Sequence, residues 1–169
     1  MRDRWIAVIA LATTLCGPAL AASMDDLNLP DRKPGQWKMT IQPTGMPKPI
    51  VTEICLDAAT DKALMKAGMS MSQCAEMTVG HDGNDTIIDA TCTIGGMTLK
   101  SHSVISGDFQ SAYTVHIVSD RIAGTSPMPK HSEMTQAATW EGDCKGLKPG
   151  ELLMPNGMKM DMTKMLGGG

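Results

Sequence analysis

Methionine side chains are the most numerous groups in this sequence that could take part in chemistry. The chain has 16 methionines among 169 residues, and five candidate metal ligands lie near its C-terminus: Met154, Met158, Met160, Met162 and Met165. Thioether sulfur is a soft ligand that suits Cu(I). An extended segment would project Met158, Met160 and Met162 from one face. The alternative is that methionine fills the core of this chain, since it is flexible and spread throughout the sequence.

Two histidines could approach each other across a predicted hairpin. The strands expected over 97–106 and 110–119 share an apolar face if their odd-numbered residues lie together. A three-residue loop would then place His102 opposite Thr114 and diagonal to His116, close enough for a weak metal-binding or pH-sensitive pair. The competing interpretation is a solvated polar face.

No combination of residue types predicts an active site. Serines and 4 histidines are present, but none lies in a recognisable nucleophile motif, and neither a phosphate-binding loop nor a dinucleotide fingerprint occurs. We therefore expect no enzymatic activity and no cofactor, with Cu(I) at the methionines as the alternative. The net charge of −3 gives no electrostatic basis for binding nucleic acid.

The N-terminus has the three parts of a secretory signal peptide. Arg2 and Arg4 precede an apolar run over 5–15, and small residues follow at an A-x-A site. The sequence therefore predicts export to the periplasm, with cleavage near Ala21 or Ala22.

Cys16 permits a second interpretation, a lipoprotein signal, but the residues before it suit lipid attachment poorly. Cleavage at the alanines would discard Cys16. No later apolar run is long enough to span a bilayer, so we expect no transmembrane anchor.

Four cysteines remain after cleavage and predict two disulfides. Turn-forming residues separate Cys74 from Cys92, and antiparallel pairing centred on Gly83 would place the two cysteines opposite each other. By elimination, Cys55 pairs with Cys144. The paired short spacings of a zinc site are absent from the sequence.

Alternating apolar and polar residues predict about seven antiparallel strands, over 36–42, 50–56, 75–79, 86–94, 97–106, 110–119 and 132–140. In the first strand, Trp37 belongs to the apolar face. A short helix is expected over 58–67, with Asp57 as its N-cap and Gly68 at its end. The fold class is therefore mainly β: an antiparallel meander curled into a barrel-like or wrapped sheet, with one short helix and two disulfides.

Short motifs in a fixed order accompany these strands. They are Lys33-Pro34-Gly35-x-Trp37, Cys55-Leu56, the Gly-Asn turn between Cys74 and Cys92, Gly96-Met97-Thr98, Gly107-Asp108 and Gly142-Asp143-Cys144. Over roughly residues 33–144 the chain resembles the bacterial DUF3617 family of exported proteins of unknown function. Gln36 and Lys38 depart from the family's usual pattern. The resemblance implies a periplasmic location and the β framework, and it implies no activity.

The predicted organisation is a signal peptide over 1–21, a flexible lead-in over 22–32, a β domain over 33–146 and a Met/Gly-rich tail over 147–169. The tail is expected to be mobile, or at most to form a peripheral strand over 158–162. We expect the domain to bind a small apolar molecule or a protein partner of the cell envelope, because a curled sheet lined by methionine can hold such a ligand. The alternative function is Cu(I) binding by the tail.

Overall fold

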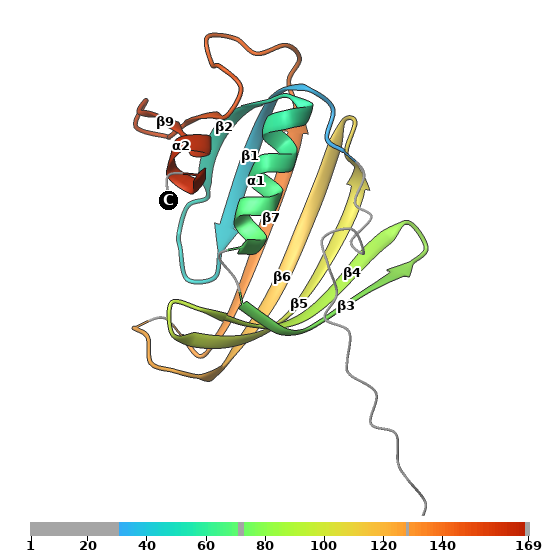
Figure 1. The fold of residues 1–169 in the computed structure, drawn as a ribbon, viewed down its shortest axis with the longest axis vertical. Coiled ribbons are helices and arrows are strands. Elements are labelled where there is room, and N and C mark those ends of the chain that lie inside the picture. Colours follow the sequence, from blue (N-terminus) through green and yellow to red (C-terminus); the bar gives the residue numbers. More distant parts are fainter. Residues whose placement is uncertain (1–30, 71–72, 128, 168–169) are drawn as a thin grey trace, which may run out of the picture.

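The structure, a computed structural model, describes residues 31–70, 73–127 and 129–167. The predicted signal peptide and most of the lead-in lie outside these ranges. The described ranges form nine strands and two helices: β1 Gly35–Pro43, β2 Ile50–Leu56, α1 Ala58–Ser70, β3 Gln73–Asp82, β4 Asp85–Ile94, β5 Met97–Asp108, β6 Ala112–Ala123, β7 His131–Trp140, β8 Glu151–Leu153, β9 Lys159–Asp161 and α2 Met162–Gly167 (Figure 1).

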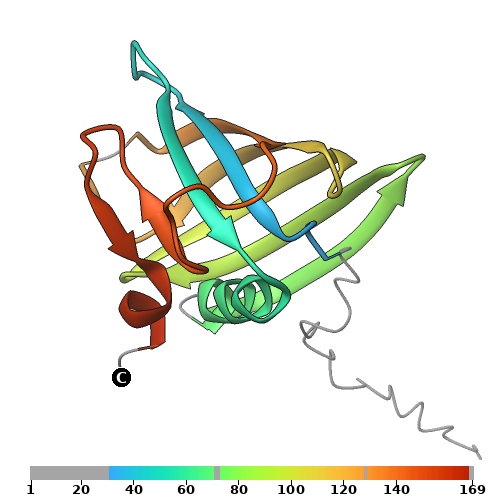
Figure 2. The same cartoon turned by 90° about the horizontal axis from the view of Figure 1, so that it is seen from above.

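All nine strands form one antiparallel sheet in the order β3-β4-β5-β6-β7-β1-β2-β8-β9. Strands β3 to β7 follow one another as a meander, and β1 then pairs with β7 and carries β2 on its other side. The sheet is strongly curved but not closed, as Figure 2 shows. This confirms the predicted mainly β fold, and of the two predicted shapes the wrapped sheet is the one that forms.

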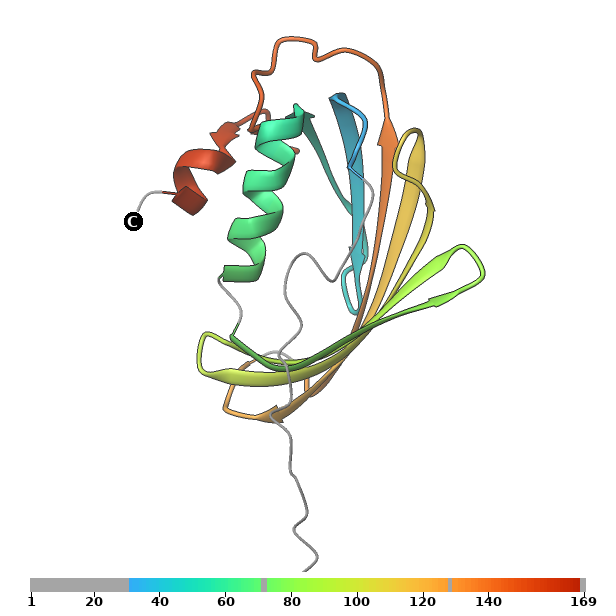
Figure 3. The same ribbon diagram turned by 45° about the vertical axis from the view of Figure 1, so that its right-hand side comes forward.

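Helix α1 lies on the concave face of the sheet (Figure 3). Beneath it, the core consists of Trp37, Ile54, Leu56, Tyr113 and Ala138. These residues come from four adjacent strands, and the side chain of Trp37 is 0 % exposed. Trp37 is therefore the core residue that the alternation of β1 predicts.

The Lys33-Pro34-Gly35 segment wraps the indole of Trp140. Trp140 Nε1 donates a hydrogen bond of 3.0 Å to the Pro34 carbonyl, and Lys33 Nζ lies 3.5 Å from the ring centroid. Gly35 has a φ of +134°, and a Cβ there would lie 2.4 Å from the carbonyl oxygen of Gly142. Only glycine fits this position, because both the conformation and the close approach exclude a side chain.

Both predicted disulfides are confirmed. Cys55 bonds to Cys144 and Cys74 bonds to Cys92. Cys74 faces Cys92 across β3 and β4, but a β-bulge between Cys74 and Glu76 shifts the rest of the hairpin by one residue.

Helix α1 begins where the sequence predicts and ends later. Asp57 caps it, since its Oδ1 accepts a hydrogen bond of 2.7 Å from the backbone N–H of Thr60. Bonds from the Thr60 side chain and backbone also lower the pKa of Asp57. Gly68 takes a helical backbone inside α1, so the prediction that it ends the helix is wrong. Glycine ends a helix only where it leaves the helical conformation.

The segment after Cys144 lies on the domain, which differs from the expected mobile tail. Strand β8 pairs with β2, β9 pairs with β8, and α2 lies against α1. Gln36 anchors the start of the segment, because its Oε1 accepts a hydrogen bond of 2.8 Å from the Lys145 N–H. Leu147 is buried. The expected peripheral strand forms as β9, but it ends at Asp161, where α2 begins.

Candidate functional site

An apolar pocket of about 390 Å³ lies between the concave face of the sheet, α1 and the C-terminal segment. Eight of its lining residues are apolar, and the other two are Arg32 and Thr52. The ten are Arg32, Met39, Ile41, Ile50, Thr52, Ile54, Leu64, Leu152, Met154 and Met162. A pocket of this volume with few polar groups is typical of sites for small molecules.

Strand alternation builds the floor of this pocket. In β1, Met39 and Ile41 point to the concave face, because they follow the buried Trp37 at intervals of two residues. In β2, Ile50 and Thr52 lie on the same face: Ile41 pairs with Ile50, and Met39 pairs with Thr52. The floor therefore follows from the period of these two strands and their register.

The walls come from elements that are distant in sequence. Leu64 reaches the pocket from α1, and Leu152 lies beside Ile54 because β8 pairs with β2 there. Met162 is the first residue of α2. Asp161 caps this helix by accepting a hydrogen bond of 3.1 Å from the Thr163 N–H.

Hydrogen bonds to the carboxylate of Asp161, first from the Thr163 side chain and then from Lys164, lower the pKa of Asp161 to about 2. The cap is therefore charged at neutral pH, which suits the N-terminus of a helix. It holds Met162 at the rim of the pocket.

Arg32 is the charged residue of the lining, and its charge is already paired. Its Nε donates a hydrogen bond of 2.7 Å to Asp61 Oδ1, and its Nη1 donates one of 3.2 Å to the Tyr113 hydroxyl. The side chains of Arg32 and Asp61 are 14 % and 7 % exposed. Burial opposes the charge on Arg32, but Tyr113 and Asp61 outweigh it, and the pKa of Arg32 is raised. The pocket therefore presents an apolar surface and a neutralised ion pair, which together can hold an apolar molecule out of water.

The predicted methionine ligands are divided between the pocket and the surface. Met154 and Met162 line the pocket, Met160 is half-buried in β9, and Met158 and Met165 are 51 % and 61 % exposed. The strand β9 covers only Lys159–Asp161, so Met158 and Met162 lie outside it and the expected alternation over 158–162 does not form. Cu(I) binding stays a prediction.

Met39 is a pocket residue that the residue types in the sequence did not predict. It joins Met154 and Met162 in the lining. The alternating apolar residues of β1 predict that Met39 is buried. They do not indicate that Met39 belongs to a binding site.

The predicted register of β5 and β6 is wrong, although the faces are right. His102 lies opposite Val118 and not opposite Thr114, and His116 lies opposite Val104. The two histidines are still diagonal neighbours on one face, as predicted, because His116 is two residues from Val118. The loop is displaced because β5 continues through Gly107 to Asp108, whose Oδ1 accepts a hydrogen bond of 2.7 Å from the Gln110 N–H.

Each of these histidines has a carboxylate partner on the convex face. His102 Nδ1 lies 2.8 Å from Asp89 Oδ1, and His116 Nε2 lies 4.0 Å from Glu133 Oε2. His131 contacts both Asp120 and Glu133, and these hydrogen bonds raise its pKa. In the part of the chain that the structure describes, no group of three or more His, Cys, Asp or Glu residues could hold a metal ion.

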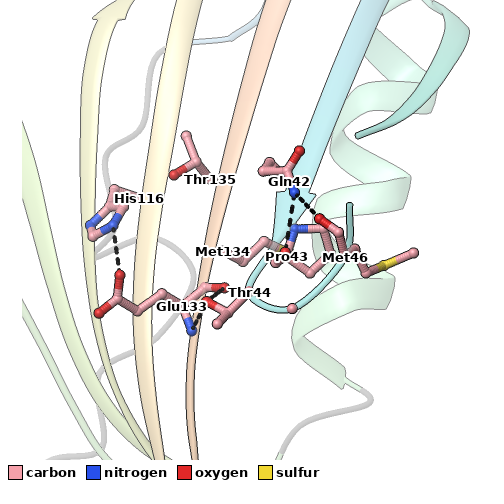
Figure 4. Close-up of a pocket in the computed structure, with 9 residues that line it drawn as sticks. Gln42, Pro43, Thr44, Met46, His116, Glu133, Met134 and Thr135 are labelled. Carbon is pink, nitrogen blue, oxygen red and sulfur yellow. Dashed lines mark hydrogen bonds and ion pairs between the residues drawn. The ribbon is translucent and has the colours of Figure 1, made fainter. Parts of the chain in front are cut away.

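A second, more polar pocket of about 280 Å³ adjoins His116 (Figure 4). The loop after β1 forms one side of it, where Gln42 Nε2 donates a hydrogen bond of 2.8 Å to the Met46 carbonyl. From the same loop, the Thr44 hydroxyl donates one of 2.9 Å to the carbonyl of Glu133, which lies in β7 on the other side. Its polar groups are thus largely paired within the protein, and the apolar pocket is the stronger candidate.

Comparison with known protein families matches residues 32–144 to a family described as "Protein of unknown function (DUF3617)". The chain belongs to the DUF3617 family. The family region supplies the curved sheet from β1 to β7, α1 and all four disulfide cysteines. The segment that adds Leu152, Met154 and Met162 to the pocket lies beyond it. Comparisons with curated proteins and with solved structures found no match.

The residues that the structure describes form two helices, α1 and α2. Neither α1 nor α2 is long and apolar enough to cross a bilayer.

Proposed function

We propose that this protein is an exported, non-enzymatic binding protein that holds a small apolar molecule in the pocket between β1, β2, α1 and α2. The observation that carries the proposal is the composition of the pocket lining: eight apolar side chains surround about 390 Å³, and the one charged side chain, Arg32, is paired with Asp61. Burying apolar ligand surface there gains about 25 cal/mol per Å². Methionine at the rim can adapt to ligands of different shapes.

Export to the periplasm is supported by the basic and apolar N-terminal residues and by the two disulfides. Disulfides persist in oxidising compartments and are rare in the cytosol. The intact mass of protein from a periplasmic fraction should correspond to a chain that starts near Ala22 or Ser23. A full-length chain in the cytosolic fraction would contradict this part of the proposal.

The binding proposal is tested by native mass spectrometry of protein purified from the cell envelope without detergent. We expect a second, heavier species that loses an apolar molecule on collisional activation. The Met162→Trp variant should lack this species, because an indole at the first residue of α2 fills the pocket.

Met165→Trp is the matched control, since Met165 belongs to the same helix and is 61 % exposed. It should keep the bound species. A single apo mass for the unmodified protein over repeated preparations would count against the proposal, as would equal occupancy in both variants.

A further inference from the structure

Thr52 is the uncharged polar residue of the apolar pocket. It lies between Ile50 and Ile54 on the concave face of β2, and it is opposite Met39 in β1. The residue is only 6 % exposed. A buried hydroxyl without a partner loses its hydrogen bonds to water and is costly to keep.

The Thr52 hydroxyl makes no hydrogen bond with another residue in the described ranges 31–70, 73–127 and 129–167. In the same ranges, every fully enclosed side-chain nitrogen or oxygen has a hydrogen-bond partner. The Thr52 hydroxyl is therefore not sealed inside the protein. Thr52 lines the apolar pocket and also a neighbouring cavity beside β8, so its hydroxyl is an unused hydrogen-bonding group in the wall of the pocket.

The charges around the pocket exclude most charged ligands. A ligand carboxylate placed beside Arg32 would also approach the carboxylate of Asp61, whose side chain is 7 % exposed. A ligand cation would meet the guanidinium of Arg32 in the same apolar surroundings. In both cases the charge would lose its hydration without gaining an unpaired partner, which is strongly unfavourable.

From these two observations we infer that the occupant is an uncharged amphiphile: an apolar chain with one neutral hydrogen-bonding group, such as a hydroxyl or carbonyl, that pairs with the Thr52 hydroxyl. The inference rests on the proposed function, because it names the ligand class of the same pocket. The apolar chain lies along Met39, Ile41 and Leu152, and the neutral group faces Thr52.

Three probes with the same chain and different head groups test the ligand class: decan-1-ol, decanoate and decylammonium. Each is titrated calorimetrically at neutral pH, below its aggregation concentration, into the unmodified protein. We expect decan-1-ol to bind at least about tenfold more tightly than either ion, since burying an unpaired charge costs more than about 1.4 kcal/mol, which is a factor of ten.

Thr52→Val tests the hydrogen bond, because valine keeps the shape of threonine and lacks its hydroxyl. It should weaken decan-1-ol binding about fivefold, the usual effect of losing one neutral hydrogen bond. Thr40→Val is the matched control on β1. Its side chain lies on the opposite face of the sheet, and the affinity should not change.

The outcomes separate this inference from the proposed function. If decan-1-ol binds equally well to the unmodified protein and to Thr52→Val, or if decanoate binds as tightly as decan-1-ol, the inference is wrong and the pocket is still a binding site. If none of the three probes binds, the proposed function fails and the inference fails with it. Thermal unfolding of each variant, with and without probe, verifies that the comparison is between folded proteins.

Discussion

Toward one end of the sheet, inside the short strands β8 and β9, strands β1 and β2 bury Trp37, Ile54 and Leu56 beneath α1. At the other end, β3 and β4 contribute Ala90 alone to the buried apolar residues that the structure describes. Each end also carries a disulfide. Cys55–Cys144 joins residues 89 positions apart, and Cys74–Cys92 joins residues 18 positions apart. The first end is stabilised by burial, while the second depends on strand pairing and a covalent bond. The candidate pocket lies at the first end, where α1 covers the side chains of β1 and β2.

Removing each disulfide in turn should give the largest difference in unfolding free energy between the two ends. In the chain-entropy model, changing Cys55 and Cys144 to Ala costs about 4.6 kcal/mol, and changing Cys74 and Cys92 costs about 3.2 kcal/mol. Cys55 is also 1 % exposed, which adds a packing loss at the first end. Urea unfolding measures both free energies. A larger loss at Cys74–Cys92 would reverse the comparison.

Trp37→Ala should cost about 3–5 kcal/mol, since a fully buried indole is replaced by a cavity. Its hydrogen bond of 2.8 Å from Nε1 to the Lys33 carbonyl is lost as well. Ile94→Ala, at the end of β4, is the control. Ile94 is 40 % exposed, and the change there should stay within about 0.5 kcal/mol. Similar losses in both variants, measured by chemical unfolding, would show that the two ends are packed alike.

Two glycines with positive φ offer a milder comparison. Gly35→Ala should cost at least about 2 kcal/mol, because the new Cβ would meet the Gly142 carbonyl and the Trp140 ring. Gly83→Ala, in the β3–β4 turn, has open space around it and should cost only about 1 kcal/mol for the left-handed conformation. Thermal unfolding of both variants decides the order, and an equal loss would mean that β1 accommodates the methyl group.

The smallest expected effect on stability comes from the protonation of His131. This residue lies on the convex face, away from both ends of the sheet. Its pKa is raised by Asp120 and Glu133, so protonated His131 stabilises the folded protein. That contribution is fully present below the unfolded pKa of about 6.5 and is lost as pH rises through the higher folded pKa. An NMR titration should show the raised pKa of His131 falling in Asp120→Asn. An unchanged midpoint in that variant would remove Asp120 as the cause.

The sequence predicted the strands, the disulfides and the buried face of β1 well, since each depends on a short-range pattern. Alternation around Trp37 identified the core, and turn residues around Gly83 identified the Cys74–Cys92 hairpin. The errors have local causes that periodicity does not reveal. A bulge after Cys74 shifts the register by one residue, and the side chain of Asp108 displaces the β5–β6 loop.

The pocket could not be predicted in the same way, because its walls meet only in the folded chain. Met39, Leu64 and Met162 come from three separate elements, and Arg32 comes from the segment before β1. The sequence predicted a methionine-lined sheet that can hold a ligand, but it contained no pattern that pairs β8 with β2. The ion pair between Arg32 and Asp61 could not be predicted from a short-range pattern either, because the two residues are 29 positions apart in the sequence.

The most direct test of the proposed binding site is a methyl NMR titration of the intact protein with decan-1-ol. We predict saturable shifts for the pocket methyl groups of Ile41, Ile54 and Leu152, while Val79 and Ile88 at the β3–β4 end stay unchanged. Shifts centred on β3 and β4, or no saturable shifts in the pocket, would contradict the proposal that the apolar end of the sheet is the site of binding.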